Sequence, residues 1–223
     1  AEAKFKAEGR AAHWRFALTP GEIKWDDLAR GETSFMAENL SDPVLIRGDG
    51  SYLYTLCSVL DDIDLGMTDI IRGEDHTSNT AAQIQLFQAL ADQAGLSDFQ
   101  MPRFAHMPLV SGADGAKLSK SNGALSIREL REHGGLEPLT IVAFLSRLGT
   151  PDGPQPVSDI TELASSFKIE RFGRSGPRMD PEELGPLNSK IVRQLPFESV
   201  TDRFEGMTQA QWAAIQPNLE KLS

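Results

Sequence analysis

A strand, a helix and a second strand follow one another within about 40 residues, and this order constrains the fold more than any other feature. Thr68 to Arg72 (TDIIR) has the composition of a short buried strand. The next segment predicts a helix, because Ser78 or Asn79 can cap its start and Gly95 can end it. Arg103 to Val110 (RFAHMPLV) predicts the second strand. We therefore expect a right-handed βαβ unit of a parallel sheet, in which ligands bind at the carboxyl ends of the strands.

Length and composition favour a globular protein. The 223 residues give room for one large domain or two small ones, and they carry 22 basic and 32 acidic residues, a net charge of −10. No apolar run approaches the ~20 residues of a membrane helix, so we expect no membrane partner. The single cysteine, Cys57, excludes an internal disulfide and suits a reducing compartment, so we expect a cytoplasmic protein. A monomer is the default expectation, because no large apolar stripe is left unexplained.

The acidic balance disfavours indiscriminate nucleic-acid binding, because neutralisation of phosphates drives such binding. Residues 51–100 hold eight acidic residues and a single base, Arg72, whereas residues 101–150 hold six bases and four acids. From the residues alone, the first expectation for Arg72 is an ion pair with one of three acids: Asp61, Asp62 and Glu74. The alternative is a guanidinium that clamps a substrate carboxylate at a strand end, helped by the hydroxyls of Tyr54 and Ser58.

The segments on either side of this unit differ in character. Short strands are expected before it, over residues 13–18, 33–36 and 44–47. Helices are expected after it, where three capping patterns occur: Ser126 with Glu129, Asp159 with Glu162, and Asp180 with Glu183, where Pro181 takes the first helical position. An apolar stripe is expected to lie in the core of this helical part, and consists of Leu139, Val142, Leu145 and Leu148. Residues 151–156 are expected to form a linker rich in proline and glycine.

A loop from Ser111 to Gly123 reads SGADGAKLSKSNG. Its two lysines, three residues apart and held between glycines, can surround a polyphosphate with ammonium groups and backbone amides. The loop is not a Walker loop, because Lys117 follows alanine rather than glycine, and a solvated surface turn is the ordinary alternative. His76 and His106 can each serve as a base or a metal ligand. Four histidines without paired spacing favour polar or core roles, and we assign no metal cluster.

Four motifs follow one another along the chain: Tyr-x-x-x-Ser, IIRGEDH, HMPLV and KLSKS. In this order and at this spacing they resemble the catalytic domain of bacterial class I glutamyl-tRNA synthetases, in which a loop written KMSKS follows the last strand of the nucleotide-binding sheet. The resemblance extends over DGSYLYTLCSVLDDIDLGMTDIIRGEDHTSNTAAQIQLFQAL and DPEELGPLNSKIV. It implies an α/β fold: the second half of a class I Rossmann-like catalytic domain, with part of a β-rich inserted domain before it and an α-helical stem-contact region after it.

The resemblance also implies functional regions. Residues 1–47 are expected to be the remainder of the inserted acceptor-binding domain, and residues 48–125 the catalytic half with the KMSKS-type loop. Residues 126–195 are expected to contact the tRNA stem, and residues 196–223 to begin a helical anticodon-binding domain. The family's HIGH sequence, and the half-domain that contains it, do not occur in these residues. We therefore expect a fragment that is a poor catalyst by itself.

Individual residues take their expected roles from the matching motifs. Two loop residues are expected to be catalytic: Lys117 and Lys120. Contacts with ATP are expected from Lys117, Leu118, Ser119, Lys120, Ser121, Leu109, Val110 and Asp75. The glutamate pocket is expected to contain Arg72, Tyr54, Ser58 and His76. The tRNA acceptor end is expected to lie near Arg30 and Gly31.

The implied activity is ATP-dependent ligation of L-glutamate to tRNA(Glu) through a glutamyl adenylate, with Mg²⁺ accompanying ATP. Basic residues that can face tRNA are Arg103, Arg128, Arg131 and Arg147. Two alternatives stay open: an enzyme like the glutamyl-queuosine tRNA(Asp) synthetases, and a non-catalytic tRNA-binding module. The helical extension over residues 159–223 argues against the first, because that relative ends soon after the catalytic domain. A binding module differs from both enzymes in that it need not retain a HIGH sequence.

Overall fold

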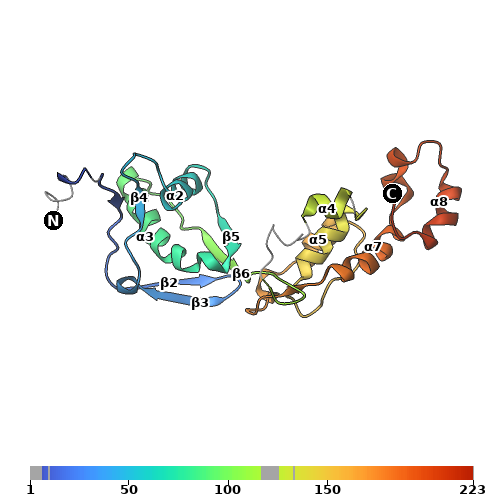
Figure 1. Ribbon diagram of the computed structural model, residues 1–223, viewed down its shortest axis with the longest axis horizontal. Coiled ribbons are helices and arrows are strands. Elements are labelled where there is room, and N and C mark those ends of the chain that lie inside the picture. The colour runs from blue at the N-terminus through green and yellow to red at the C-terminus, as the bar shows by residue number, and fades with distance from the viewer. Residues whose placement is uncertain (1–6, 10, 117–125, 133, 223) are drawn as a thin grey trace. The chain divides into compact units, whose positions relative to one another are not determined.

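The computed structural model describes residues 7–9, 11–116, 126–132 and 134–222 (Figure 1). The chain divides into two compact units, residues 1–107 and residues 108–223, which we call the sheet unit and the helical unit. The division between residues 107 and 108 coincides with none of the predicted functional boundaries, which lie at residues 47, 125 and 195. Those boundaries therefore stay predictions. No helix in the described part of the chain is long and apolar enough to cross a membrane.

A four-stranded sheet forms the centre of the sheet unit (Figure 1). Its strands are β2 (Glu22–Asp27), β3 (Gly31–Met36), β5 (Asp69–Gly73) and β6 (Arg103–Met107), in the order β3-β2-β6-β5. β5 and β6 are parallel neighbours, and helix α3 (Thr77–Ala94) connects them. The predicted parallel strand-helix-strand unit is therefore confirmed. β6 stops at Met107 rather than at residue 110, because Pro108 follows and has no N–H for the ladder.

The two ends of α3 differ in how well the sequence predicts them. The 3-10 turn η2 (Glu74–His76) leads directly into the helix, and His76 takes the cap position. Ser78 and Asn79 therefore lie inside the first turn, and their predicted capping role is wrong. Gly95 ends the helix as predicted, with a φ of 68° that glycine adopts without strain.

The core of the sheet unit joins β6 to two helices. α2 (Tyr54–Asp64) contributes Val59, α3 contributes Leu86 and Phe87, and β6 contributes Phe104. Because α2 is helical, its residues at positions 54 and 58 lie one turn apart and share a face.

The strands before α2 are only partly as predicted. β1 (Trp14–Arg15) and β4 (Val44–Ile46) pair antiparallel in a small sheet of their own, so the strand expected over residues 13–18 is reduced to two residues. The strand expected at 33–36 is part of β3, which the 3-10 turn η1 (Ala37–Asn39) follows. The sequence patterns do not predict β2, because its acidic end obscures the alternation of inward residues. β2 pairs with both β3 and β6 and so brings Asp27 into the main sheet.

The helical unit has short helices around an apolar core. Its described α-helices are α4 (Ile127–Glu132), α5 (Pro138–Arg147), α6 (Ile160–Ser166), α7 (Leu184–Val192) and α8 (Gln209–Ile215). Its 3-10 turns are η4 (Ile169–Arg171), η5 (Pro181–Glu183), η6 (Phe197–Ser199), η7 (Thr201–Arg203) and η8 (Gln216–Asn218). Two short parallel strands, β7 (Ser111–Gly112) and β8 (Arg178–Met179), pair beside them. Phe144 of α5 and Ile191 of α7 are fully buried in the core, and residues 151–156 form no regular helix or strand, as predicted.

Two predicted caps are present at the starts of α-helices. Ser126 accepts a hydrogen bond from the backbone N–H of Glu129 at 3.1 Å, and the Glu129 carboxylate accepts one from the backbone N–H of Ser126 at 3.2 Å. This pair is a reciprocal capping box for α4. At α6, Asp159 accepts from the backbone N–H of Glu162 at 2.8 Å.

The third cap differs by one residue. Asp180 accepts from the backbone N–H of Glu182 at 3.0 Å rather than from Glu183, because η5 is a 3-10 turn and winds more tightly than an α-helix. Pro181 occupies the first position of this turn, as predicted, where its missing N–H costs nothing.

The predicted apolar stripe on α5 is wrong in part. Val142 and Leu145 are 41% and 43% exposed, whereas Ile141 and Phe144 are buried. A step of three residues falls about 60° short of a full turn, because an α-helix has ~3.6 residues per turn. A stripe through positions 139, 142, 145 and 148 therefore drifts around the helix. The buried face instead includes Thr140.

Candidate functional site

Arg72 lies near the carboxyl end of β5, and side chains from α2, α3 and β6 surround its guanidinium. Nη1 donates a hydrogen bond to the Tyr54 hydroxyl at 3.0 Å. Nη2 donates to Thr80 Oγ1 and to Gln83 Oε1, both at 2.5 Å. Nε approaches His106 Nε2 at 3.4 Å. Each of these four acceptors belongs to a side chain without negative charge, so in the part of the chain that the structure describes the guanidinium is oriented by hydrogen bonds and no contacting group compensates its charge.

The predicted ion pair of Arg72 is wrong. Among the described residues no carboxylate lies within ion-pair distance of its guanidinium; Glu74, one of the three predicted partners, pairs instead with Arg30 at 2.6 Å. Burial raises the pKa of the Asp62 carboxyl above its ordinary value, and the charge of Arg72 lowers it only in part. A cation with only neutral partners favours an anionic ligand, and a guanidinium suits a carboxylate in particular.

Polar residues of α2 and α3 support Arg72. Thr80 is completely buried and Gln83 is 2% exposed. The Gln83 amide also donates to Ser58 Oγ at 2.8 Å, so Ser58 reaches Arg72 only through Gln83. No motif in the sequence points to Thr80 and Gln83 as site residues. The available signal is that both are polar and three residues apart on the face of α3 that also carries the buried Phe87.

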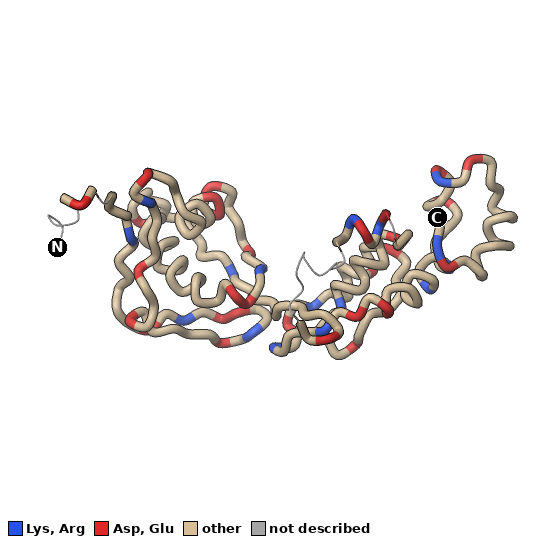
Figure 2. The backbone as a smooth tube through the Cα atoms, viewed as in Figure 1, with Lys and Arg blue, Asp and Glu red and all other residues tan. Residues whose placement is uncertain are grey.

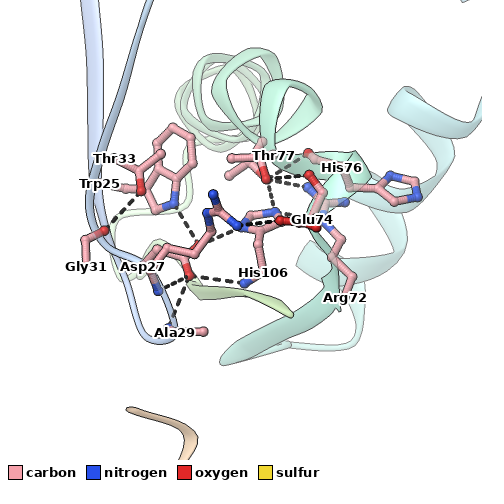
Figure 3. A network of polar contacts seen from close by, with 12 residues as sticks. Trp25, Asp27, Ala29, Gly31, Thr33, Arg72, Glu74, His76, Thr77 and His106 are labelled. Carbon is pink, nitrogen blue, oxygen red and sulfur yellow. Dashed lines mark hydrogen bonds and ion pairs between the residues drawn. The ribbon is translucent and has the colours of Figure 1, made fainter. Parts of the chain in front are cut away.

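Asp27 and His106 form a buried pair beneath this layer, and Figure 3 shows their contacts. Both side chains are fully inaccessible, and Asp27 Oδ2 lies 2.5 Å from His106 Nδ1. Asp27 Oδ1 accepts from the backbone N–H groups of His106, Ala29 and Arg30, each at 3.1 Å. Oδ2 also accepts from Trp25 Nε1 at 3.2 Å. Because buried polar groups need partners, this arrangement fixes the carboxylate in a single orientation.

Opposing effects set the protonation of the pair. Burial raises the pKa of the Asp27 carboxyl, but the hydrogen bonds from His106, Trp25 and Ala29 outweigh it, and the pKa lies below its ordinary value. Burial lowers the pKa of His106, which Asp27 raises in part and the charges of Arg72 and Arg30 lower further. Asp27 is therefore ionised and His106 neutral near pH 7.

The rings of the predicted pocket residues Tyr54 and His76 contact each other, and the Tyr54 hydroxyl contacts Arg72. Their rings are 5.5 Å apart and tilted by 58°, and Tyr54 is 51% exposed. His76 Nδ1 lies 3.2 Å from the side-chain amide of Asn79. Asp75, predicted to contact ATP, is the exposed middle residue of η2. The structure thus brings Arg72, Tyr54 and His76 to one strand end, as expected of a parallel sheet.

Two residues are predicted to lie near the tRNA acceptor end: Arg30 ends the turn after β2, and Gly31 is the first residue of β3. The φ of Gly31 is 72°, a value that glycine adopts without strain. The Arg30 side chain pairs with Glu74, and its backbone N–H donates to Asp27. These two contacts hold the turn after β2 against η2 and against the end of β2.

Leu109 and Val110, predicted to hold adenine, belong to the helical unit. Val110 packs against its core, and Leu109 is 44% exposed. The next residue, Ser111, donates its backbone N–H to the carbonyl of Pro177 at 3.0 Å, which fixes the segment on β8. The predicted loop residues Lys117, Leu118, Ser119, Lys120 and Ser121 lie outside the described residues. Within the described ranges, no group of three or more His, Cys, Asp or Glu side chains can hold a metal ion.

Fold and site together define a class of protein: an α/β domain whose mixed sheet contains parallel strands, with an arginine near the end of one of them that has no carboxylate partner among the described residues. A family model described as "tRNA synthetases class I (E and Q), catalytic domain" matches residues 1–186, and the chain belongs to this family. The prediction of a class I catalytic fold is therefore confirmed.

Curated relatives and solved structures agree with this assignment. The chain is 45% identical to glutamate–tRNA ligase 1 of Maricaulis maris, with 100% of the chain and 49% of the relative covered. It is 45% identical to glutamate–tRNA ligase of Azospirillum brasilense, with 99% and 49% covered. The fold matches the glutamate–tRNA synthetase structure from Elizabethkingia anophelis with a TM-score of 0.72 at 20% identity, over 99% of this chain and 49% of that one. The chain spans about half the length of the curated relatives it matches.

Proposed function

We propose that this chain is part of an enzyme that ligates L-glutamate to tRNA(Glu), using ATP. The observation that carries the proposal is the guanidinium of Arg72, held by neutral acceptors at the carboxyl end of β5 without a carboxylate partner among the described residues. The family and the names of the relatives support glutamate as the ligand of such a site.

The proposed reaction has two steps. A carboxylate oxygen of glutamate attacks the α-phosphorus of ATP, which forms glutamyl adenylate and releases pyrophosphate. A ribose hydroxyl at the 3′ end of the tRNA then attacks the glutamyl carbonyl, and AMP leaves. Such reactions depend mainly on positioning and electrostatic stabilisation. In this proposal Arg72 binds a glutamate carboxylate, with Tyr54 and His76 beside it and Ser58 acting through Gln83.

The ATP contacts in the proposal rest on the sequence motifs. Lys117 and Lys120 would stabilise the charge that develops on pyrophosphate, and Asp75, Leu109 and Val110 would contact the nucleotide. The described residues offer no cluster of metal ligands, so we take Mg²⁺ to arrive with ATP, held by phosphate oxygens.

Ion pairs occupy most of the arginines suggested for the tRNA contact. Three of the four arginines suggested for it have an acidic neighbour: Arg103 pairs with Asp69 at 2.6 Å, Arg131 with Glu132 at 2.9 Å, and Arg147 with Asp152 at 3.6 Å. Figure 2 shows basic and acidic residues intermixed in each unit. We propose Arg30 and Gly31 as the part of this chain nearest the acceptor end. A monomeric, cytoplasmic enzyme completes the proposal.

The test is glutamate-dependent ATP/pyrophosphate exchange in the presence of tRNA(Glu). We compare the 223-residue chain with a longer chain that restores the upstream half of the nucleotide fold. Exchange in the longer chain alone supports the proposal. If neither exchanges but tRNA still binds, the chain is a non-catalytic tRNA-binding module.

A single loop substitution sharpens this test. In the longer chain, Lys120→Ala should slow adenylate formation by about a hundredfold or more while the KM for glutamate changes little, because the lysine is proposed to act on the transition state. Pre-steady-state adenylate formation measures the first quantity and exchange at varied glutamate the second. Equal losses in both would count against the role of Lys120.

A further inference from the structure

An unbroken row of hydrogen bonds joins the buried Asp27 to the half-buried Arg72. Figure 3 labels Asp27, His106 and Arg72. Asp27 Oδ2 lies 2.5 Å from His106 Nδ1. His106 Nε2 lies 2.8 Å from Thr80 Oγ1, and Thr80 Oγ1 lies 2.5 Å from Arg72 Nη2. We call these four residues the Asp27 relay. The family motifs in the sequence assign a role only to its last member, Arg72.

One arrangement of donors and acceptors suits all the short contacts of the relay. A guanidinium only donates, so Thr80 accepts from Arg72 Nη2 and its single proton is left for another acceptor. His106 Nε2 is the nearest, at 2.8 Å, whereas the carbonyl of His76 is 3.3 Å away. Arg72 Nε also points at His106 Nε2, from 3.4 Å. Nε2 must therefore accept, and the imidazole proton resides on Nδ1, where it is donated to Asp27.

The far end of the relay is firmly anchored. Asp27 accepts hydrogen bonds from three backbone N–H groups, from the Trp25 indole and from the imidazole of His106, so its carboxylate has no freedom to rotate. The charged groups that act on His106 are Asp27, Arg72 and Arg30. Their combined effect with burial keeps His106 neutral near pH 7, as the relay requires.

The relay leaves part of the guanidinium available. Arginine has five N–H donors, and the contacts with Tyr54, Thr80, Gln83 and His106 engage four of them. The fifth, on Nη1, has no acceptor in the described part of the chain, and Nη1 is also the nitrogen that contacts the exposed Tyr54. A carboxylate bound directly to Arg72 would occupy these donors and compete with an anionic ligand. A relay of neutral groups orients the arginine without that competition.

We propose that Asp27 and His106 are positioning residues for Arg72: the buried carboxylate selects the imidazole tautomer that, with Thr80, holds the guanidinium ready for a substrate carboxylate. This inference rests on the function proposed above, because it takes that carboxylate to belong to glutamate. Neither residue contacts the substrate in this arrangement.

The first test uses a matched pair at Thr80 in the complete enzyme. Thr80→Val has nearly the same shape but no hydroxyl, so it leaves Arg72 Nη2 and His106 Nε2 without their shared partner. We expect the KM for glutamate to rise about tenfold to a hundredfold, with kcat and the KM for ATP changed less than about threefold. Thr80→Ser keeps the hydroxyl and should restore most of the glutamate affinity. Gln88→Ala, an exposed change on the same helix, serves as the control.

The second test reverses the relay. In Asp27→Asn the amide N–H₂ can donate to Nδ1 of His106, which moves the imidazole proton to Nε2. The Nε2–H would then face two other donors, the Thr80 hydroxyl and Arg72 Nε. We expect a rise in the KM for glutamate similar to that of Thr80→Val. Nitrogen-15 NMR of labelled histidine, with His106→Asn to assign the signal, should show Nδ1–H in the unsubstituted chain and Nε2–H in Asp27→Asn.

The outcomes separate this inference from the proposed function. If the unsubstituted enzyme shows no glutamate-dependent exchange, the proposed function fails. The NMR signal of His106 then tests the relay by itself: Nδ1–H supports the proposed arrangement and Nε2–H overturns it. If exchange is normal and both variants keep the original KM for glutamate, only the relay fails. Parallel losses in kcat and in both KM values would mean a merely structural role and also overturn it. Should Asp27→Asn fail to fold, the Thr80 pair and the tautomer of the unsubstituted chain give the answer.

Discussion

Both units bury polar side chains, but the two buried networks end differently. In the sheet unit the network runs from Asp27 through His106 to Arg72, a half-buried cation. In the helical unit it centres on Asn188, which is fully buried. Asn188 Oδ1 accepts from the backbone N–H of Glu137 at 2.8 Å and from Thr140 Oγ1 at 2.9 Å, and its Nδ2 donates to the backbone carbonyl of Glu220 at 2.7 Å.

This difference distinguishes a candidate ligand-binding site from a network that only stabilises the fold. The hydrogen bonds of Asn188 connect α5, α7 and the C-terminal segment, and each of their partners is an uncharged backbone or hydroxyl group. The network of the sheet unit ends on Arg72, whose fifth N–H donor and positive charge have no partner among the described residues. Buried polar groups cost free energy unless they are paired, so both networks are satisfied internally. Only one of them offers an interaction to a ligand.

Arg72→Ala should give the largest effect that distinguishes the two networks. We expect the KM for glutamate to rise about a hundredfold to a thousandfold, because truncation removes a charged hydrogen-bonding partner of the ligand. Arg72→Lys keeps the positive charge but lacks the planar guanidinium. Its KM for glutamate should lie between the values of the unsubstituted enzyme and of Arg72→Ala. Glutamate-dependent exchange with the complete enzyme measures both variants. An unchanged KM in Arg72→Ala would make Arg72 a structural residue like Asn188.

Asn188→Ala should have the opposite character. It leaves the N–H of Glu137 and the hydroxyl of Thr140 buried without an acceptor, so we expect a loss of about 2–4 kcal/mol in the free energy of unfolding. The KM for glutamate should not change. Urea unfolding measures the first quantity, with Ser189→Ala at the neighbouring, half-buried position as the control. A selective effect on glutamate would break the distinction between the two networks.

A smaller effect should appear in the pH dependence of stability. Burial holds the pKa of His106 below its ordinary value of 6.5, so the unfolded chain binds more protons just below that pH. The contribution of His106 to stability is therefore complete above pH 6.5 and is lost as the pH falls below it. Asp27, whose pKa is also lowered, adds a further loss only as the pH falls below its ordinary value of 3.8.

Urea unfolding between pH 8 and pH 5 tests this expectation. The measured quantity is the difference in pH slope between the unsubstituted chain and His106→Gln, which does not titrate. Asn188→Ala should keep the original slope, because asparagine carries no titratable proton. Equal slopes in the unsubstituted chain and in His106→Gln would mean that His106 folds with an ordinary pKa.

The parts of the site that the sequence predicts are those determined by neighbours along the chain. The strand over residues 69–73 and the helix up to Gly95 follow from local periodicity and turn chemistry, and they place Arg72 at a strand end. Motif order adds Tyr54 and His76. These features need no knowledge of how distant segments meet.

The remaining parts depend on contacts between distant segments. Thr80 and Gln83 look like ordinary polar residues of a helix, and only the position of Arg72 beside them reveals their role. β2 escapes prediction because its acidic end suggests solvent, whereas Asp27 is buried against β6. The same limit explains why charge alone suggested an ion pair for Arg72. The sequence shows which acidic residues are near Arg72 along the chain, but not which are near it in space.

The contact between Asp27 and His106 spans 79 residues of sequence. Closing so long a loop is slow compared with forming a helix or a hairpin, so this pair depends on an event late in folding. During synthesis Arg72 leaves the ribosome 34 residues before its partner His106, and until then it is an ordinary flexible arginine. Affinity for an anion at this position therefore reports that the whole sheet unit has folded, and a ligand that needs the ordered guanidinium would select completed chains over nascent ones.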